Sequence, residues 1–278
     1  MYHPTVAQLD AAASGFHLMN MLEEKQQCFR MAGRLQQKLL NESPYGTGTR
    51  FFTAQWVWAL GHIGLLHQVM RWLARHEPET ICIVEAQGAA NPYFLQALLD
   101  HFSTLKLCPK LPDVSRHAAM CNAMFFGCPD GNSTLVDYYK KIEKVCKGES
   151  LLTLTIKQKV RAEQIKTELK LDHNKPIVAI QHRNLPNDPE RNTSLEMVRE
   201  HLRKFPKHQP VITGTDPRDE FPYASVLELD NPQEGSFLLS ASCDQFIGSN
   251  SGAWVVPHGF GRPVELINDH LRAAWIYE

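Results

Sequence analysis

The stretch from Gln245 to Asn268 constrains the fold of this chain more than any other. It begins with an apolar run at 246–247, continues through small residues over 248–252 and an apolar helical segment, and ends in a second apolar run over 264–267. A strand, a turn, a helix and a second strand in this order are typical of a parallel α/β sheet. The stretch therefore predicts that fold.

The small-residue turn of this stretch is predicted to bind an anion. A turn between a strand and a helix leaves backbone N–H groups unpaired, and the helix dipole favours negative charge there. The residues concerned are Ser249, Asn250, Ser251 and Gly252. Ser and Asn are also ordinary helix caps, so the turn alone is weak evidence. A phosphate-bearing ligand is the first hypothesis.

The length and charge of the chain limit the number of domains and the kinds of partner that it can have. Its 278 residues are enough for two α/β domains, and 43% hydrophobic with 21% charged residues are typical of a globular protein. Lys and Arg number 29 against 30 Asp and Glu, a net charge of -1. Because nucleic-acid binding needs a concentrated basic face, we expect no nucleic-acid partner.

The cysteines and apolar stretches indicate a cytoplasmic location. Seven cysteines are scattered without a Cys-x-x-Cys pair, which favours reduced thiols over a disulfide framework. No basic segment followed by an apolar core marks the start, and no apolar stretch reaches the length of a membrane span. We expect a soluble cytoplasmic protein whose oligomeric state stays open.

Strands and helices alternate along the chain, and a polar segment at 172–176 divides it. We predict an N-terminal acceptor-side domain over 1–172, with a leading helix over 5–42, and a C-terminal ligand-binding domain over 173–278. The alternation in the second domain favours a doubly wound parallel sheet. Strands are predicted over 51–60, 81–84, 177–181, 211–213 and 226–229. Helices are predicted over 93–102, 138–146, 156–171, 193–205 and 237–241. For the helix over 193–205, Thr193 is the predicted cap and Glu196 completes a capping box.

Two arginines follow one of the predicted strands. Ligands of open parallel sheets bind beyond the carboxyl ends of the strands, and guanidinium groups match the paired oxygens of a diphosphate. Arg183 and Arg191 are therefore candidates for diphosphate binding. The alternative is that Arg183 pairs with Asp188 or Glu190 at the surface, and the combination with the serine turn is the stronger signal.

The candidates for acid–base catalysis are His62 and Glu85. His62 lies between glycines at a predicted helix start, where the positive helix end favours the neutral imidazole that a general base needs. A structural role for His62 and a capping role for Glu85 are the alternatives. Residues of the same loops that we expect to bind substrate are Gly61, Gly64, Gln87, His182 and Asp216.

Several other chemistries lack a pattern in this sequence. Carboxylates such as Asp188 and Asp216 have no convincing metal-ligand spacing, so we expect no obligatory metal and no cofactor. Neither a nucleophile elbow nor a dinucleotide fingerprint is present. Trp56, Trp58 and Tyr93 are candidates for stacking on a sugar, although aromatic residues near a strand are more often core.

Motifs in the C-terminal half resemble a bacterial family of glycosyltransferases. That family has a strand ending in His-x-Arg, a downstream Arg-Asn, a Gly-Ser-x-Ser-Gly turn and a Phe-Gly-x-Pro strand. The matching segments are 177–184, 188–192, 244–253 and 260–264, and upstream Gly61-His62-Ile63 resembles the family's Gly-His-Leu turn. Gln181 stands where the family has histidine, with His182 one position later.

The resemblance implies the GT-B architecture, in which two Rossmann-like domains face each other across a cleft that holds a nucleotide-sugar. Fucosyltransferases and heptosyltransferases of this architecture hold the donor diphosphate without a metal. Carried over, Arg183 and the 249–252 turn would hold the diphosphate, and His62 would activate the acceptor hydroxyl. The hypothesis is a metal-independent glycosyltransferase, and the alternatives are a nucleotide-sugar epimerase or a non-catalytic relative that binds a sugar nucleotide or a protein.

Overall fold

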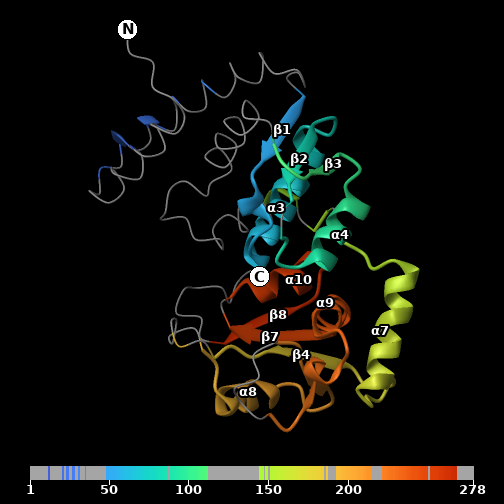
Figure 1. Ribbon diagram of the computed structural model, residues 1–278. Helices are drawn as coiled ribbons and strands as arrows, with labels where there is room; N and C mark the ends of the chain where they lie inside the picture. The colour runs from blue at the N-terminus through green and yellow to red at the C-terminus, as the bar shows by residue number, and fades with distance from the viewer. Residues whose placement is uncertain are drawn as a thin grey trace. The chain divides into compact units, whose positions relative to one another are not determined.

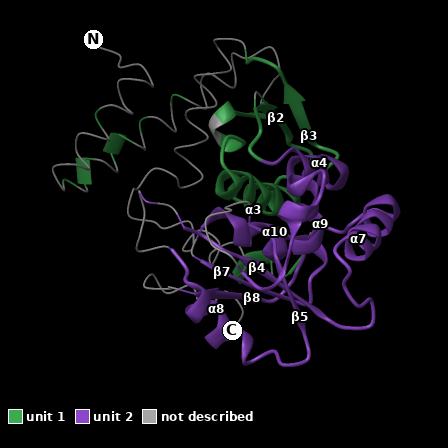
Figure 2. Cartoon of the chain, turned by 60° about the horizontal axis from the view of Figure 1, so that its bottom comes forward, with its two compact units in different colours: residues 1–90, 102–149 green, residues 91–101, 150–278 purple. Residues whose placement is uncertain are grey.

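The computed structural model forms two compact units (Figure 1, Figure 2). It describes residues 48–111 except 87, residues 144–149 except 147, residues 151–267 except 185, 187–191, 215–220 and 250, and isolated positions between 12 and 35. One unit comprises residues 1–90 and 102–149, and the other residues 91–101 and 150–278. The sequence-based boundary at 172 differs from this grouping, because the structure places 91–101 and 150–172 with the second unit. The predicted helices over 5–42 and 138–146 fall mainly outside the described residues.

The first unit contains a parallel three-stranded sheet with the order β1-β2-β3. A long helix, α3, follows β1 and packs through Ile63, Leu66, Val69, Met70 and Leu73, all buried at helical spacing. The strand expected over 81–84 is confirmed, whereas β3 was not predicted. The elements are β1 (Thr49–Phe52), α3 (Leu60–His76), β2 (Ile81–Glu85) and β3 (Leu105–Cys108).

The prediction of one strand over 51–60 is wrong beyond Phe52. The chain instead forms a 3-10 helix, η1 (Ala54–Trp56), and enters α3 at Leu60. Trp56 is buried and its ring contacts Phe52 edge to face, with ring centroids 5.0 Å apart. Aromatic residues favour strands because they suit a half-buried surface, and here a turn buries them equally well.

The second unit contains a parallel five-stranded sheet with the order β6-β5-β4-β7-β8. The chain starts at the central strand, builds outward through β5 and β6, and returns to the other side of the central strand. The prediction of an α/β protein with parallel sheets is confirmed, and the facing arrangement of two domains stays a prediction. The strands are β4 (Ile177–Gln181), β5 (Gln209–Ile212), β6 (Ala224–Ser225), β7 (Gln245–Ser249) and β8 (Val264–Ile267).

The helices of this unit begin at polar caps. Thr155 and Gln158 form a capping box at the start of α7, and Asn231 accepts a hydrogen bond from the Glu234 N–H at the start of α9. The helices are α4 (Pro92–His101), α7 (Ile156–Glu168), α8 (Leu195–Leu202), η3 (Val226–Glu228), α9 (Pro232–Ser242), η4 (Gly252–Trp254) and α10 (Val255–Gly259). None of the described helices is both long and apolar enough to cross a bilayer.

Two sequence predictions in this unit are wrong. The expected strand over 226–229 is the 3-10 helix η3, because Ser225 caps it and Glu228 completes the capping box. The cap of α8 is Ser194, whose hydroxyl accepts from the Met197 N–H, and not Thr193. Thr193 has a different function in the loop after β4, as described below.

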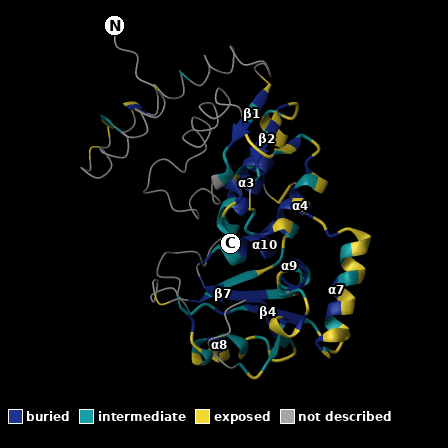
Figure 3. Cartoon of the chain, in the orientation of Figure 1, coloured by how far each residue is buried: buried dark blue, intermediate teal, exposed yellow. Residues whose placement is uncertain are grey.

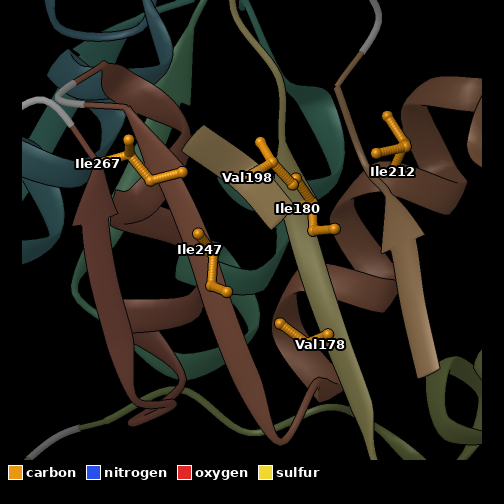
Figure 4. Close-up of a cluster of buried hydrophobic side chains, with 6 residues drawn as sticks. All are labelled: Val178, Ile180, Val198, Ile212, Ile247 and Ile267. Carbon is orange, nitrogen blue, oxygen red and sulfur yellow. The ribbon is translucent and has the colours of Figure 1, made fainter. Parts of the chain in front are cut away.

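A core of branched aliphatic side chains holds α8 against the five-stranded sheet (Figure 4). Val198 of α8 packs with side chains from four strands, and the cluster consists of Val178, Ile180, Val198, Ile212, Ile247 and Ile267. Figure 3 shows β4 and β7 almost wholly buried, as expected for the central strands of a sheet covered on both faces. Burial of these side chains is the main stabilising term of the unit.

We expect Ile180→Ala to lower the free energy of unfolding by about 2 to 5 kcal/mol, because it leaves a cavity among fully buried side chains. Urea denaturation followed by circular dichroism measures this loss. Ile156→Ala is the matched control, because Ile156 is 82% exposed, and its effect should stay within about 0.5 kcal/mol. Equal losses for the two variants would contradict the assignment of this core.

Candidate functional site

The strand order of the second unit reverses between β4 and β7. The chain leaves β4 toward one edge of the sheet and returns at β7, on the opposite side of β4. The chain connections therefore leave these two strands in opposite directions, and ligands of doubly wound sheets bind beyond the carboxyl ends of the strands at such a point. The topology thus points to the ends of β4 and β7.

Three polar side chains meet at these strand ends. The hydroxyls of Ser249 and Ser251 each donate a hydrogen bond to Gln181 Oε1, both at 3.1 Å. The Gln181 amide Nε2 donates to the His182 carbonyl at 3.1 Å. Ser249 is fully buried, whereas Gln181 is half-buried. The Ser249 hydroxyl therefore joins the turn to β4 from inside the unit.

The turn after β7 satisfies part of its own backbone. The Ser251 N–H donates to the Ser249 carbonyl at 2.7 Å, and the Ala253 N–H donates to the Ser251 hydroxyl at 3.4 Å. Two of the N–H groups near the start of η4 are therefore used within the turn, which differs from the predicted row of unpaired donors. Gly252 is half-buried at the start of η4, a short helical segment that continues into the five-residue α10.

Arg183 is the charged residue at the end of β4, and Thr193 fixes its backbone from both sides. The Arg183 N–H donates to the Thr193 hydroxyl at 3.2 Å, and the Thr193 N–H donates to the Arg183 carbonyl at 2.9 Å. The intervening loop therefore returns to its starting point. Arg183 itself is half-buried, and its backbone is held just beyond the carboxyl end of β4.

His182 is packed inside the unit. Its ring is 1% exposed, lies against Phe221 with ring centroids 4.5 Å apart, and has Nδ1 3.1 Å from the Thr193 hydroxyl. The backbone of Gly214 passes so close that a Cβ there would lie 2.9 Å from the His182 carbonyl oxygen. The buried His182 ring therefore packs inside the unit and contacts the loop through Thr193. At position 214 only glycine fits without a shift of the backbone.

In the first unit, His62 lies in the first turn of α3, which follows β1. The Trp58 indole N–H donates to His62 Nδ1 at 2.6 Å. A neutral imidazole that accepts at Nδ1 carries its proton on Nε2, so Nε2 is a hydrogen-bond donor in this arrangement. Gly61 and Gly64 lie in the same helical turns as His62, and Gly64 is buried.

Glu85 is the last residue of β2 and is 5% exposed. The next helix, α4, has a cap at Asn91, whose Oδ1 accepts the Phe94 N–H at 2.9 Å. The carboxyl ends of parallel strands share one edge, and the Ala90 N–H donates to the Val57 carbonyl, which joins the loops after β1 and β2. His62 and Glu85 therefore belong to the same edge of the three-stranded sheet.

Three of the described thiols are unsuited to nucleophilic catalysis. Burial raises the pKa of Cys82 to about 12 and that of Cys243 to about 12, and burial followed by the Glu85 charge raises the pKa of Cys108. The thiolate is the nucleophilic form, and these shifts disfavour it. Among the residues that the structure describes, no cluster of three or more His, Cys, Asp or Glu side chains is placed to hold a metal ion.

Four predicted site residues lie outside the described part of the chain, namely Gln87, Arg191, Asp216 and Asn250. Sequence reasoning missed three residues that shape the site, which are Gln181, Thr193 and Gly214. The position of Gln181 at the end of an apolar strand was a usable signal. Gly214, just after a strand, was another, whereas the contacts of Thr193 span a loop and leave no local pattern.

No known protein family and no curated protein matches the sequence. Three solved structures resemble the chain. They are the E. coli ADP-heptose LPS heptosyltransferase II (11% identity, 78% of this chain and 83% of that one, TM-score 0.47), a family 9 glycosyl transferase from Veillonella parvula (11%, 78% and 79%, 0.49) and the iron-containing heptosyltransferase TibC, solved with ADP-D-β-D-heptose (12%, 79% and 57%, 0.41). All three of these neighbours are glycosyltransferases.

We expect Thr193→Val to lower the free energy of unfolding by about 1 to 3 kcal/mol, because the Arg183 N–H and His182 Nδ1 lose a shared partner in a buried setting. Chemical denaturation measures the change. Thr153→Val is the control, since Thr153 is exposed, and it should shift stability by less than about 0.5 kcal/mol. A neutral Thr193→Val variant would show that the loop closes without this hydroxyl.

Proposed function

We propose that the protein is a glycosyltransferase that moves a sugar from a nucleoside diphosphate donor to an acceptor nucleophile without a metal ion. One observation carries the proposal. Arg183 follows β4 at the reversal of strand order, two residues after Gln181, which accepts hydrogen bonds from Ser249 and Ser251. The same positions carry the sequence motifs that resemble nucleotide-sugar-dependent enzymes.

The chemistry of the leaving group fits a guanidinium at this place. As the glycosidic bond breaks, negative charge grows on the departing diphosphate, and a positive group already fixed in place stabilises that charge. Guanidinium binds two phosphate oxygens at once, which a lysine ammonium does not do. Because Thr193 holds the Arg183 backbone, this part of the backbone need not rearrange when the donor binds.

On the acceptor side we propose His62 as the general base, with Glu85 as the alternative. His62 Nδ1 is occupied by the Trp58 indole, so it can take a proton only after that indole moves away. Trp58 is 64% exposed, so moving its indole costs little buried contact. Once the indole has moved, Nδ1 accepts the proton of the acceptor hydroxyl as its oxygen forms the new bond to the sugar and the nucleoside diphosphate leaves.

Arg183→Ala should weaken binding of a nucleoside diphosphate by about tenfold or more, because a charged hydrogen bond contributes about 1.5 to 3 kcal/mol. Isothermal calorimetry with ADP, UDP and GDP measures the dissociation constant. Arg183→Lys should recover only part of the affinity. Arg199→Ala, on the exposed surface of α8, is the control and should bind like the wild type. Unchanged affinity in Arg183→Ala would argue strongly against the proposed donor site.

His62→Ala should lower kcat by about 100-fold or more while leaving diphosphate affinity unchanged, as expected for loss of a general base. Trp58→Phe removes the hydrogen bond to Nδ1, so it should retain turnover and shift the pH profile of kcat. His76→Ala, at the exposed end of the same helix, is the control. If His62→Ala keeps full kcat, Glu85→Gln is the next variant to measure.

The same assays separate the two alternatives. Consumption of a nucleotide-sugar in the absence of any acceptor would identify an epimerase. Binding of the diphosphate without turnover, unchanged by His62→Ala, would identify a non-catalytic relative. Transfer to an added acceptor, with release of the free nucleoside diphosphate, is the outcome that the proposal requires.

A further inference from the structure

A second cavity lies entirely within the second unit, among α4, α7 and α9. Its volume is about 630 Å³, within the usual size range of small-molecule sites. None of its lining residues belongs to the site at the ends of β4 and β7. The cavity therefore needs an explanation of its own.

The lining combines apolar and aromatic side chains with several flat polar groups. Three glutamines and two carboxylates contribute, namely Gln96, Gln158, Gln164, Asp100 and Glu234. An amide presents a donor and an acceptor side by side, and a carboxylate presents two acceptors. A hydroxyl both donates and accepts. Two neighbouring hydroxyls of one ligand can therefore bind together to one amide or one carboxylate.

The charges of the lining balance. Lys157 and Arg161 contribute two positive charges, and Asp100 and Glu234 two negative ones. Arg161 is already engaged, because Nε lies 3.2 Å from Glu234 and Nη1 lies 2.5 Å from Glu168. The hydrogen bond to Glu168, followed by the one to Glu234, raises the pKa of Arg161. The cavity thus has no surplus of positive charge for a phosphate, and a neutral polar ligand fits it better.

A fixed aromatic pair completes the lining. The rings of Tyr93 and Phe237 are nearly parallel, with centroids 6.2 Å apart and an angle of 20°. The Asn231 amide donates to the Tyr93 hydroxyl at 2.5 Å, while its carbonyl oxygen caps α9. Tyr93 is therefore held at its ring and at its hydroxyl, which lowers the entropy cost of binding against it.

Three of the polar side chains, Gln96, Asp100 and Gln158, already make hydrogen bonds within the chain. Gln158 Oε1 accepts the Thr155 N–H at 2.8 Å in the capping box, and the Gln96 amide donates to Asp100 Oδ1 at 2.8 Å. Groups fixed in this way bind a rigid ring of hydroxyls better than mobile ones do. An aromatic face beside ordered amides and carboxylates suits a sugar, which has apolar C–H faces and a rim of hydroxyls.

We propose that this cavity is a binding site for a neutral sugar unit, separate from the site at the ends of β4 and β7. Gln96, Gln164 and Asp100 bind the hydroxyls, and Tyr93 contributes the apolar contact. Sugar binding here does not depend on the proposed transfer reaction, because the cavity is formed by other elements of the unit.

Saturation-transfer NMR of the full chain with D-glucose, D-galactose, N-acetyl-D-glucosamine and maltotriose tests the proposal, with UDP as a charged comparison. We expect saturable binding of at least one sugar, weakened by about tenfold in Gln164→Ala. Gln164→Trp, which fills the cavity, should abolish binding. Both substitutions are at an exposed position of α7, so the fold should survive, as circular dichroism will check.

Two controls make the outcome specific. Glu200→Ala, on exposed α8, should bind the sugar like the wild type, and Arg183→Ala should lose diphosphate affinity without losing sugar binding. Failure of this proposal is thereby distinct from failure of the proposed transferase. The absence of sugar binding by the folded protein would overturn the inference, as would binding that Gln164→Trp leaves unchanged. Displacement of the bound sugar by UDP from this cavity would overturn it as well.

Discussion

The hydrogen bonds from Ser249 and Ser251 to Gln181 join strand ends that lie 68 and 70 residues apart in the sequence. They form only because β4 and β7 pair in parallel, with Gln181 opposite Gly248. A Cβ at 248 would lie 3.2 Å from the Gln181 Cβ and 2.8 Å from the Phe246 ring. The missing side chain therefore gives Gln181 room at the point where the strand order reverses.

At this edge of the sheet the buried groups hold the loops in place, and a half-buried group is the proposed ligand contact. Ser249, His182 and Thr193 are buried and hold the two loops in place. Arg183 lies at the rim, on a backbone that Thr193 fixes at both its N–H and its carbonyl. The fixed backbone removes that part of the ordering cost of binding, and the charge of the guanidinium is the physical basis of the proposed diphosphate contact.

The sequence located the regular elements where burial and periodicity agree. The runs that became β4, β7 and β8 are short, apolar and bounded by polar or small residues, and α4 and α7 show helical spacing. It failed where a short turn buries apolar residues as well as a strand does, at Trp56 and over 226–229. It also misplaced the α8 cap, because Thr193 and Ser194 offer the same hydroxyl chemistry to neighbouring backbone groups.

The sequence by itself determined the parallel α/β class, the turn after β7 and the position of Arg183 at a strand end, since each follows from local patterns of a few residues. Only the tertiary structure decided the strand order, the role of Gln181 as acceptor for two serines and the loop closure by Thr193. It also decided the cavity among α4, α7 and α9. These features depend on contacts between residues far apart in the chain, and local propensity carries no information about which distant segments pair.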